Sequence, residues 1–491
     1  MFGVRRQKAL LVCEAANIPC EPECRCQNTA GWEAILSRRG FFTAALSVAT
    51  LPALPVSGAI GASPDPSKVT PDLAAKVVSA VASDSARLTE IFKDIHQNPE
   101  LGFMEERTAS IVAKELRALG FDVRTGIAKT GVVGILRNGS GPTVMYRADM
   151  DANAVEEATG FAYASKVRVR RSDGVDVPVA HMCGHDAHVT WMLGMAKVMV
   201  ALKQQWAGTL VLVAQPAEEL ITGAQAMIDD GMYGRRGIPR PDVLVALHTA
   251  PIPTGVVAAR GGTIMAGTDQ IDVTFHGVGG HGSMPQLAKD PVVMAAMAIA
   301  QYQMIVSRVV SPLDTAVLTV GSVQAGTDNN VIPESALLKI NLRFFDLKVR
   351  EQMINGIRAI NNGIATTYGM PPEKMPDMVM KGHSPPLVND GDTIARVRAP
   401  LKHLLGEKNV ISEFPPATGS EDAHLLKGQY ADVPVVFMAV GIADPAVFAQ
   451  SVKDGKGVPF SAHNPNYKVD LASIPQGAQI GTIAVLELLA T

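Results

Sequence analysis

Short apolar runs alternate with helical patterns through the first half of this chain. Nearly continuous apolar runs predict strands buried on both faces, at 131–136, 143–149, 209–215 and 242–248. Apolar residues at helical spacing predict helices at 73–95, 105–120, 189–205 and 223–231. Strands that alternate with helices imply crossover connections. We therefore expect an α/β fold whose central sheet is flanked by helices.

The pattern changes near residue 268, where apolar and polar positions alternate over 268–279 as in a half-exposed strand. The elements expected next are a helix at 290–309, strands at 315–326 and 335–345, and a helix at 347–368. With a further strand, this gives the β-α-β-β-α-β order of a ferredoxin-like domain. We expect such a domain to be inserted in the α/β core, which resumes with a buried strand at 433–441.

The length of 491 residues exceeds what a single hydrophobic core usually supports, so two folding units are expected. The predicted division is an N-terminal extension at 1–62, the α/β domain at 68–267 and 381–491, and the inserted domain at 268–380. The formal net charge is −3, without basic clustering. This charge argues against general binding of nucleic acid or of membrane surfaces.

The first 62 residues are predicted to lie outside the fold. Arg38 and Arg39 precede an alanine-rich apolar run that prolines interrupt, and the run is too short for a stable membrane span. The segment resembles a twin-arginine export signal cleaved after Ala59 or Ala62, which predicts a periplasmic or secreted protein. A buried N-terminal helix is the alternative, and an unprocessed protein would stay cytoplasmic. Four cysteines precede the arginines and receive no functional assignment, because their spacing matches no closed metal-site pattern: Cys13, Cys20, Cys24 and Cys26.

Ionisable side chains recur where the predicted strands end. Asp149 and Asp151 lie at or just after the end of one strand, Glu218 and Glu219 follow another, and His248 lies at the end of a third. Sites in open α/β sheets assemble at the carboxyl ends of the strands. We therefore expect these groups to converge in space.

The stretch HMCGHDAH contains Cys183 and His185, two residues apart around a glycine. A thiolate and an imidazole at this spacing can bind the same metal ion or adjacent ions. The alternative is a small buried cysteine beside a helix-capping histidine. The neighbouring His181, Asp186 and His188 favour metal binding, with Asp186 and His181 as supports of the ligands.

Three further positions could complete a metal site. In QPAEEL, one glutamate can bind a metal ion while its neighbour acts as a general base, although paired carboxylates often mark only a solvated loop. His248 and His463 are each single histidines, for which a structural role is the alternative. In the inserted domain, the glycine-rich GVGGHGSMP lacks the Lys-Ser/Thr of a phosphate-binding loop and instead presents His281. Arg343 could bind a carboxylate in bidentate fashion or lie on the surface of its strand.

Taken together, these motifs resemble those of the dinuclear metallopeptidase family of N-acyl-amino-acid amidohydrolases. This family includes hippurate hydrolases, auxin-conjugate amidohydrolases and aminoacylase-like carboxypeptidases. The resemblance covers about residues 85–490. Its markers include HQNPELGFMEERT, RADMDA, HMCGHDAH, QPAEE, ALHTAP, GGHGSMPQLAKDP, NNVIPE, GSEDAH and HNPNY. The ten residues at 167–176 are an extra segment before the metal loop, and HNPNY departs from the usual aromatic-rich sequence after the last ligand.

The resemblance implies a role for each matching residue. The ligands of two divalent ions would be Cys183, His185, Glu219, His248 and His463. Glu218 would be the catalytic glutamate. His281 and Asn330 would contact the substrate, in dimeric members from the neighbouring subunit, and Arg343 would hold the substrate carboxylate. Asp149, Asp186 and His181 would support the ligands.

The resemblance also implies an activity. A metal-activated water, with Glu218 as general base, would cleave the amide bond of an N-acyl amino acid or a small peptide-like amide. The ions would be zinc or manganese, with cobalt also suitable for a mixed S/N/O site. The inserted domain would serve as a lid and as the interface of a homodimer. The alternatives are a dipeptidase or carboxypeptidase on the same scaffold, or a catalytically silent exported binding protein.

Overall fold

A computed structural model describes residues 67–171 and 174–490 of the chain. The described residues belong to one compact unit, Gly61–Thr491. The predicted export signal and the four N-terminal cysteines lie outside the described residues, so export to the periplasm or beyond stays a prediction.

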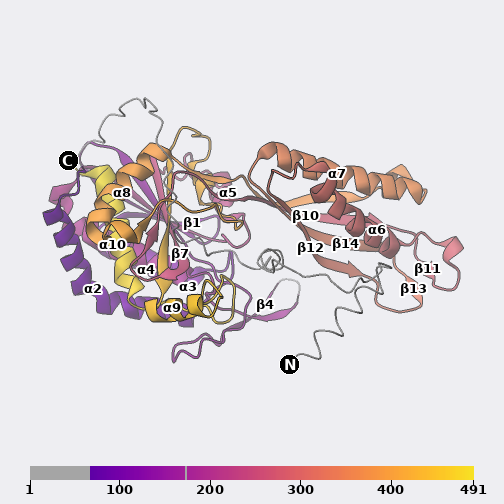
Figure 1. Ribbon diagram of the computed structural model, residues 1–491, viewed down its shortest axis with the longest axis horizontal. Helices are drawn as coiled ribbons and strands as arrows, with labels where there is room; N and C mark the ends of the chain where they lie inside the picture. The colour runs from indigo at the N-terminus through magenta and orange to yellow at the C-terminus, as the bar shows by residue number, and fades with distance from the viewer. Residues whose placement is uncertain (1–66, 172–173, 491) are drawn as a thin grey trace, which may run out of the picture. The chain divides into compact units, whose positions relative to one another are not determined.

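An eight-stranded mixed sheet forms the centre of the α/β part (Figure 1). Its four inner strands are parallel to one another, whereas β1 and β2 run antiparallel at one edge. The strands in sheet order are β1 (Asp122–Ile127), β2 (Gly131–Asn138), β6 (Gly208–Gln215), β3 (Thr143–Asp149), β7 (Val243–Pro253), β18 (Val435–Ala443), β8 (Val257–Ala258) and β17 (Val410–Ile411). The long apolar runs of the sequence are therefore strands of one sheet, and the predicted α/β fold is confirmed.

Successive residues of a strand point to opposite sides, so these apolar strands give the sheet two apolar faces, and helices cover both. One face shares a large apolar core with α2 (Pro71–Gln97), α3 (Glu106–Ala118), α4 (His185–Ala201), α8 (Gly391–Leu405) and α10 (Ser473–Leu489). The other face shares a second core with α5 (Gly223–Asp229) and the short helix η6 (Ala423–Lys427). Buried strands between two helical layers explain why their sequences are apolar without alternation.

The C-terminal helix α10 was not predicted from the sequence. It is apolar on nearly all sides and almost wholly buried, so it shows no amphipathic period. Gly477 allows close contact with α4, because a Cβ atom there would lie 2.2 Å from Cε2 of Trp191. Helix α10 is thus a central element of the core rather than a surface element.

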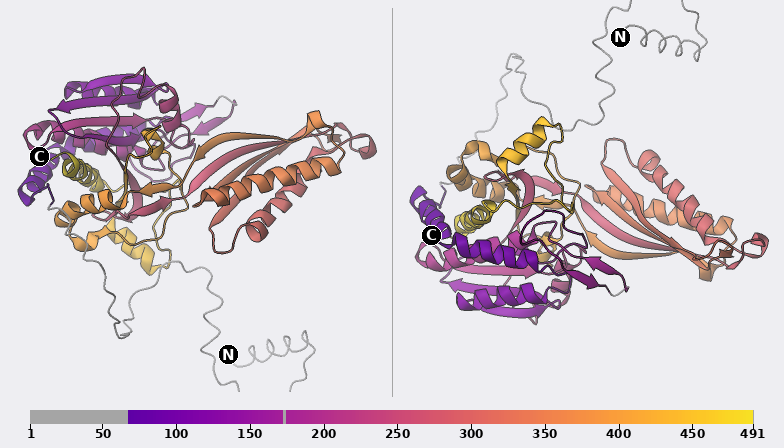
Figure 2. Two further views of the ribbon diagram at one scale, coloured as in Figure 1. Left: turned by 90° about the horizontal axis from the view of Figure 1, so that it is seen from above. Right: turned by 90° about the horizontal axis from the view of Figure 1, so that it is seen from below.

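A second, four-stranded antiparallel sheet carries two helices over one face and has its own apolar core (Figure 2). Its elements in chain order are β10 (Gly267–His276), α6 (Pro291–Met304), β12 (Ala316–Ala325), β14 (Ser335–Phe344), α7 (Leu347–Thr367) and β15 (Asp377–Ser384). The sheet order is β12-β14-β10-β15. The chain thus has the expected β-α-β-β-α-β order here, while the domain bounds and the lid and dimer roles stay predictions.

The remaining elements are short and lie mostly in connections. They are β4 (Arg168–Arg170), β5 (Asp176–Pro178), β9 (Gly262–Met265), β11 (Gly280–His281), β13 (Val331–Ile332), β16 (Leu387–Asn389), α9 (Pro445–Lys453), η1 (Lys203–Gln205), η2 (Pro285–Leu287), η3 (Ile305–Val309), η4 (Pro372–Lys374) and η5 (Glu407–Asn409). Strand β4 lies in the extra segment at 167–176 and pairs antiparallel with β5, which begins at the last residue of that segment.

Among the described residues, one helical stretch is long and apolar enough to cross a membrane by length and composition, Pro291–Val309. Its inner side contributes Met294, Ala298 and Tyr302 to the core of the four-stranded sheet. The stretch therefore belongs to a folded layer of this domain, and its outer side is left apolar.

A buried histidine joins α2 to the start of α4. His96 is 1% exposed, with Nδ1 2.6 Å from Oδ2 of Asp186 and Nε2 3.1 Å from Oε1 of Glu157. Burial opposes protonation of this imidazole, but its hydrogen bonds to the two carboxylates outweigh burial and raise its pKa to about 9. His96 is thus a cation in a Glu–His–Asp bridge at neutral pH.

This bridge predicts a pH-dependent stability. A histidine whose folded-state pKa exceeds its unfolded value stabilises fully below the unfolded value, near 6.5, and loses that contribution as pH rises through about 9. The free energy of unfolding in urea should therefore fall between these pH values. His96→Gln should lower it by roughly 2–3 kcal/mol at pH 6 and flatten its pH dependence.

The exposed His403 in α8 provides the control, because His403→Gln removes a histidine without disturbing a buried ion pair. An unaltered pH dependence in His96→Gln would contradict the assigned bridge.

Candidate metal centre

The residues predicted to form the site come from separate segments and meet at one edge of the eight-stranded sheet. Among the described residues, four sets of possible ligand atoms lie there, and the atoms of each set are within 4.8 Å of one another. The sets are Asp149, His185, His188 and His248; Cys183, Glu219 and His463; His185, Glu218 and Glu219; and Glu218, Glu421 and Asp422. Asp149 ends β3, the two glutamates follow β6, and His248 lies within β7. The predicted convergence at the carboxyl ends of parallel strands is present.

The loop that carries Cys183 is held by a glycine and a hydrogen-bond chain. Gly184 has φ +80°, and a Cβ atom there would lie 2.6 Å from Oγ1 of Thr249. The Thr249 hydroxyl donates to the Cys183 carbonyl at 2.6 Å and accepts from the Tyr467 hydroxyl at 2.8 Å. A turn that only glycine fits therefore sets the thiol and the first residue of α4 against β7.

The side chains of the cluster approach one another closely. Sγ of Cys183 lies 3.7 Å from Nε2 of His248, and Nε2 of His463 lies 3.1 Å from Oε1 of Glu219. Nε2 of His185 lies 3.8 Å from the same Glu219 oxygen. The His463 side chain is 52% exposed, so the cluster is open to solvent at this residue.

The donor set fits a pair of divalent metal ions. His185 is fully buried, yet among the described residues neither of its ring nitrogens has a hydrogen-bond partner. Buried polar atoms in proteins almost always have a hydrogen-bond partner or bind a metal ion, so we expect these nitrogens to bind a group that the polypeptide does not supply. Thiolate, imidazole and carboxylate together suit a borderline transition metal such as zinc rather than magnesium or calcium.

The cluster is also strongly polarised. Burial and the charge of Glu219 raise the pKa of the Cys183 thiol. Its contacts with His248 and His185 have the larger, opposite effect and lower the pKa to about 6. Contacts with Cys183 and Glu219 raise the pKa of His463 to about 10. The pKa of His248 rises to about 9, because the Cys183 charge outweighs burial. The anionic groups thus favour cations throughout the cluster, so metal ions and protons compete for the same sites.

Glu218 lies beside the cluster and is 5% exposed. Burial and the negative charges of Glu421 and Glu219 raise its pKa well above the ordinary value for a glutamate. Its Oε2 lies 3.9 Å from Nε2 of His185. A carboxyl with a raised pKa can both accept and return a proton near neutral pH.

The three residues predicted to support the ligands have different surroundings. Oδ1 of Asp149 lies 2.5 Å from Nδ1 of His188, and Oδ2 of Asp149 lies 3.6 Å from Nε2 of His185. Asp186 binds His96 rather than a ligand histidine. His181 is buried, and neither of its ring nitrogens has a hydrogen-bond partner in the part of the chain that the structure describes.

Several residues that shape the site received no role from sequence reasoning. Asp151 lies 3.4 Å from Nδ1 of His185, where Asp186 had been expected. Arg147 is fully buried and donates to Asp149 at 2.7 Å and to Glu421 at 2.8 Å. An arginine within the apolar strand at 143–149 was the available signal, because a buried charge requires partners.

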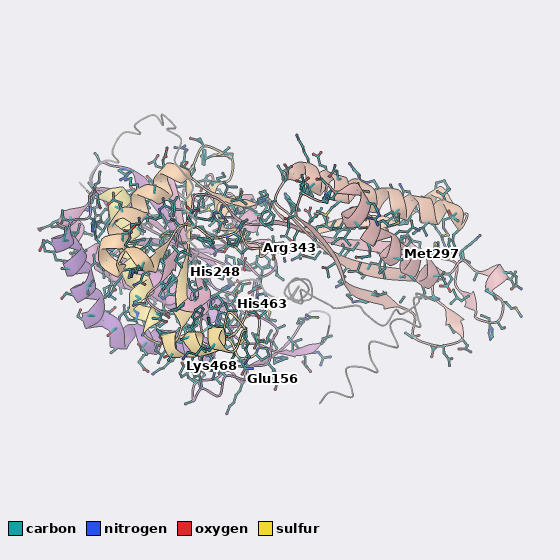
Figure 3. The ribbon with its side chains drawn as sticks, in the orientation of Figure 1. Glu156, His248, Met297, Arg343, His463 and Lys468 are labelled. Atoms are coloured by element: carbon teal, nitrogen blue, oxygen red, sulfur yellow. The ribbon has the colours of Figure 1, made fainter. Side chains whose placement is uncertain are left out.

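The predicted substrate-binding residues of the inserted domain fall into two places. Burial lowers the pKa of Arg343 on β14, although the charge of Glu218 opposes this shift (Figure 3). Its Nη1 is buried and has no hydrogen-bond partner among the described residues. His281 on β11 contacts Ser283, and Asn330 accepts from the backbone of Gly282 at 2.8 Å. Both are exposed, and neither bonds the metal cluster within this chain.

Comparison with known proteins places the fold and the motifs in one family. A model described as peptidase family M20/M25/M40 matches residues 145–487. IAA-amino acid hydrolase ILR1-like 2 of Arabidopsis thaliana is 33% identical over 400 residues, which make up 80% of this chain and 83% of that protein. Hippurate hydrolase of Campylobacter jejuni is 37% identical over 335 residues, which make up 68% of this chain and 83% of that protein.

A solved structure agrees with these sequence matches. A putative aminohydrolase from methicillin-resistant Staphylococcus aureus superposes with a TM-score of 0.70 at 27% identity, and the match covers 84% of this chain and 99% of that one. The family model extends over most of the α/β part and all of the four-stranded sheet. This chain therefore belongs to peptidase family M20/M25/M40.

Proposed function

We propose that this protein is a metal-dependent amidohydrolase that cleaves the amide bond of N-acyl amino acids or small peptide-like amides. The observation that carries this proposal is the position of Glu218. It is a buried carboxyl with a raised pKa, 3.9 Å from an imidazole nitrogen that has no hydrogen-bond partner in the described structure. The names of the relatives, a hydrolase of IAA–amino acids and a hippurate hydrolase, support the same chemistry.

Five side chains would hold two divalent ions, namely Cys183, His185, Glu219, His248 and His463. Zinc or manganese suits this set, and cobalt is a third candidate. Bound ions would supply Lewis acidity and lower the pKa of water. The five ligands come from four segments, so the site exists only once the α/β core has folded.

Glu218 would take the proton of the attacking water and later deliver it to the nitrogen of the leaving amine. Its raised pKa suits both transfers, because it makes the carboxylate a stronger proton acceptor while the resulting carboxyl can still donate that proton to the amine. Arg343 would bind the free carboxylate of the substrate, for which its unpartnered Nη1 is available. His281 would donate to the developing oxyanion, and Asn330 would contact the substrate beside it.

A homodimer through the inserted domain would complete this site. His281 and Asn330 do not bond the metal cluster within one chain, so the proposal assigns them to the site of a second copy. The outer side of α6 is apolar, with Val292, Val293 and Met297 39–43% exposed (Figure 3). The neighbouring β12 is an edge strand, which offers unpaired backbone groups to a second sheet.

Glu218→Gln tests the proposed chemistry. The variant should lose about 10²–10⁴-fold in kcat, because the amide cannot accept the proton of water. Its metal content should stay that of the wild type, since Glu218 is not a proposed ligand. The assay is hydrolysis of a panel of hippurate, other N-acyl amino acids and dipeptides by the metal-loaded protein, with metal content measured by mass spectrometry.

The exposed Glu156 supplies the matched control, and Glu156→Gln should hydrolyse the panel like the wild type. Cleavage of dipeptides alone would favour the dipeptidase or carboxypeptidase alternative. If the wild type cleaved no amide with any divalent metal, the silent binding protein would stand instead.

Met297→Glu tests the proposed dimer. A charge in the middle of an apolar interface should shift the protein from dimer to monomer in sedimentation velocity, with a matching loss of kcat. Gln303→Glu introduces the same charge at an exposed polar position of α6 and should leave the dimer intact. A wild type that sediments as a fully active monomer would exclude the dimer.

A further inference from the structure

A strained turn aims the proposed catalytic glutamate and its metal-binding neighbour. Ala217 precedes Glu218 and has φ +51°, in the left-handed region that a residue with a Cβ atom avoids. Ile221, four residues later, has φ +53°. Such a conformation persists only where its surroundings hold it. The contacts of Ala217 therefore decide where the two glutamates point.

Buried carboxylates accept hydrogen bonds from the backbone N–H groups of this turn. The amides of Glu218 and Glu219 each donate to Asp151 at 3.0 Å. The amide of Ala217 donates at 2.8 Å to Oε1 of Glu105, from the connection between α2 and α3. Three successive N–H groups thus end on carboxylate oxygens, and Glu105 binds the strained residue itself.

Glu105 is held firmly in this position. It is 0% exposed, and its Oε2 accepts from the Thr130 hydroxyl at 2.6 Å. Its Oε1 also accepts from the amide of Phe103 at 3.0 Å. Although Glu105 stands at the N-cap of α3, its side chain makes no capping bond there. The carboxyl group is directed away from its own helix and toward the turn.

A neighbouring glutamate carries out the capping that Glu105 does not. Glu100 accepts from the amides of Arg107 and Thr108 at 2.7 and 2.8 Å. Two carboxylates of one short segment therefore have different tasks, one for helix α3 and one for the turn at Ala217.

The packing around the turn agrees with this division. A Cβ atom on Gly102 would lie 3.1 Å from Cα of Ala217, so the segment that carries Glu105 lies directly against the turn. Because the backbones approach so closely, a shift of the turn has little room on this side.

We propose that Glu105 is a positioning residue that fixes the left-handed turn at Ala217 and thereby aims Glu218 and Glu219. The inference rests on the proposed hydrolase function for its effect on catalysis. The effect of Glu105 on the turn is independent of the hydrolase function and can be measured without substrate.

The test compares three variants at position 105 and its partner. Glu105→Gln keeps an acceptor oxygen for the Ala217 amide and should hold kcat within about threefold of wild type. Glu105→Leu removes the acceptor and should lower kcat about 10–100-fold with KM nearly unchanged, the loss expected when a reacting group moves by a fraction of an ångström to an ångström. Ala217→Gly, added to Glu105→Leu, should restore about fivefold to tenfold, because glycine adopts positive φ without strain.

Glu100→Leu is the matched control. It removes the neighbouring carboxylate, so it should lower the melting temperature by fraying α3 while kcat stays at the wild-type value. Hydrogen–deuterium exchange provides a second measurement, which does not depend on enzymatic activity. Glu105→Leu should speed exchange several-fold in the segment 215–223, whereas Glu100→Leu should speed it in α3.

The outcomes separate the two proposals. Faster exchange at 215–223 in Glu105→Leu, in a protein that cleaves no amide, would sustain the positioning role and reject the hydrolase function. A folded Glu105→Leu with wild-type exchange and kcat would overturn the positioning role alone, as would failure of Ala217→Gly to restore any activity. If Glu105→Leu does not fold, Thr130→Val is the milder variant, because it removes only the hydrogen bond from the Thr130 hydroxyl to the Glu105 carboxyl. It should lower kcat about threefold to tenfold, and an unchanged kcat would overturn the proposal.

Discussion

Buried negative charge at the carboxyl edge of the eight-stranded sheet is the constraint on which the site depends. Five carboxyl groups there are at most 5% exposed, namely Asp149, Asp151, Glu218, Glu421 and Asp422. Among the described residues, Arg147 is the one buried arginine or lysine, and it contacts three of the five. An ionised carboxylate away from water needs a cation or several hydrogen bonds. The arrangement of the site follows from how each of these charges is compensated.

Backbone amides and Arg147 compensate part of this negative charge. Asp151 accepts from two successive backbone amides, and Glu421 accepts from two as well as from Arg147. Within residues 67–171 and 174–490, no backbone amide or arginine bonds the Glu218 carboxyl or the Cys183 sulfur, and both groups face histidines instead. A pair of divalent ions would neutralise this remaining negative charge. The same fixed charges of Glu421 and Glu219 raise the pKa of Glu218, so the charge pattern that favours metal ions also prepares the proposed base.

The sequence predicted the elements that carry a local signal and missed those that depend on distant contacts. Buried strands such as 209–215 and the amphipathic helix near 73–95 are visible as apolar runs or periods, and both are present. Helix α10 has no polar face to reveal it. In the site, strand ends and motif resemblance indicated Cys183, His185 and Glu218. The bridges His96–Asp186 and Glu105–Ala217 span 90 and 112 residues, so no local pattern indicates them.

The metal content of the wild type and of Cys183→Ser, measured side by side, decides whether this cluster is a metal centre. Both proteins would be loaded with zinc or manganese, freed of loosely bound metal by dialysis, and measured by inductively coupled plasma mass spectrometry. The wild type should hold two ions per chain and the variant fewer, because a hydroxyl is a poorer ligand than a thiolate. A wild type without tightly bound metal, or a variant with the full wild-type stoichiometry, would contradict this prediction.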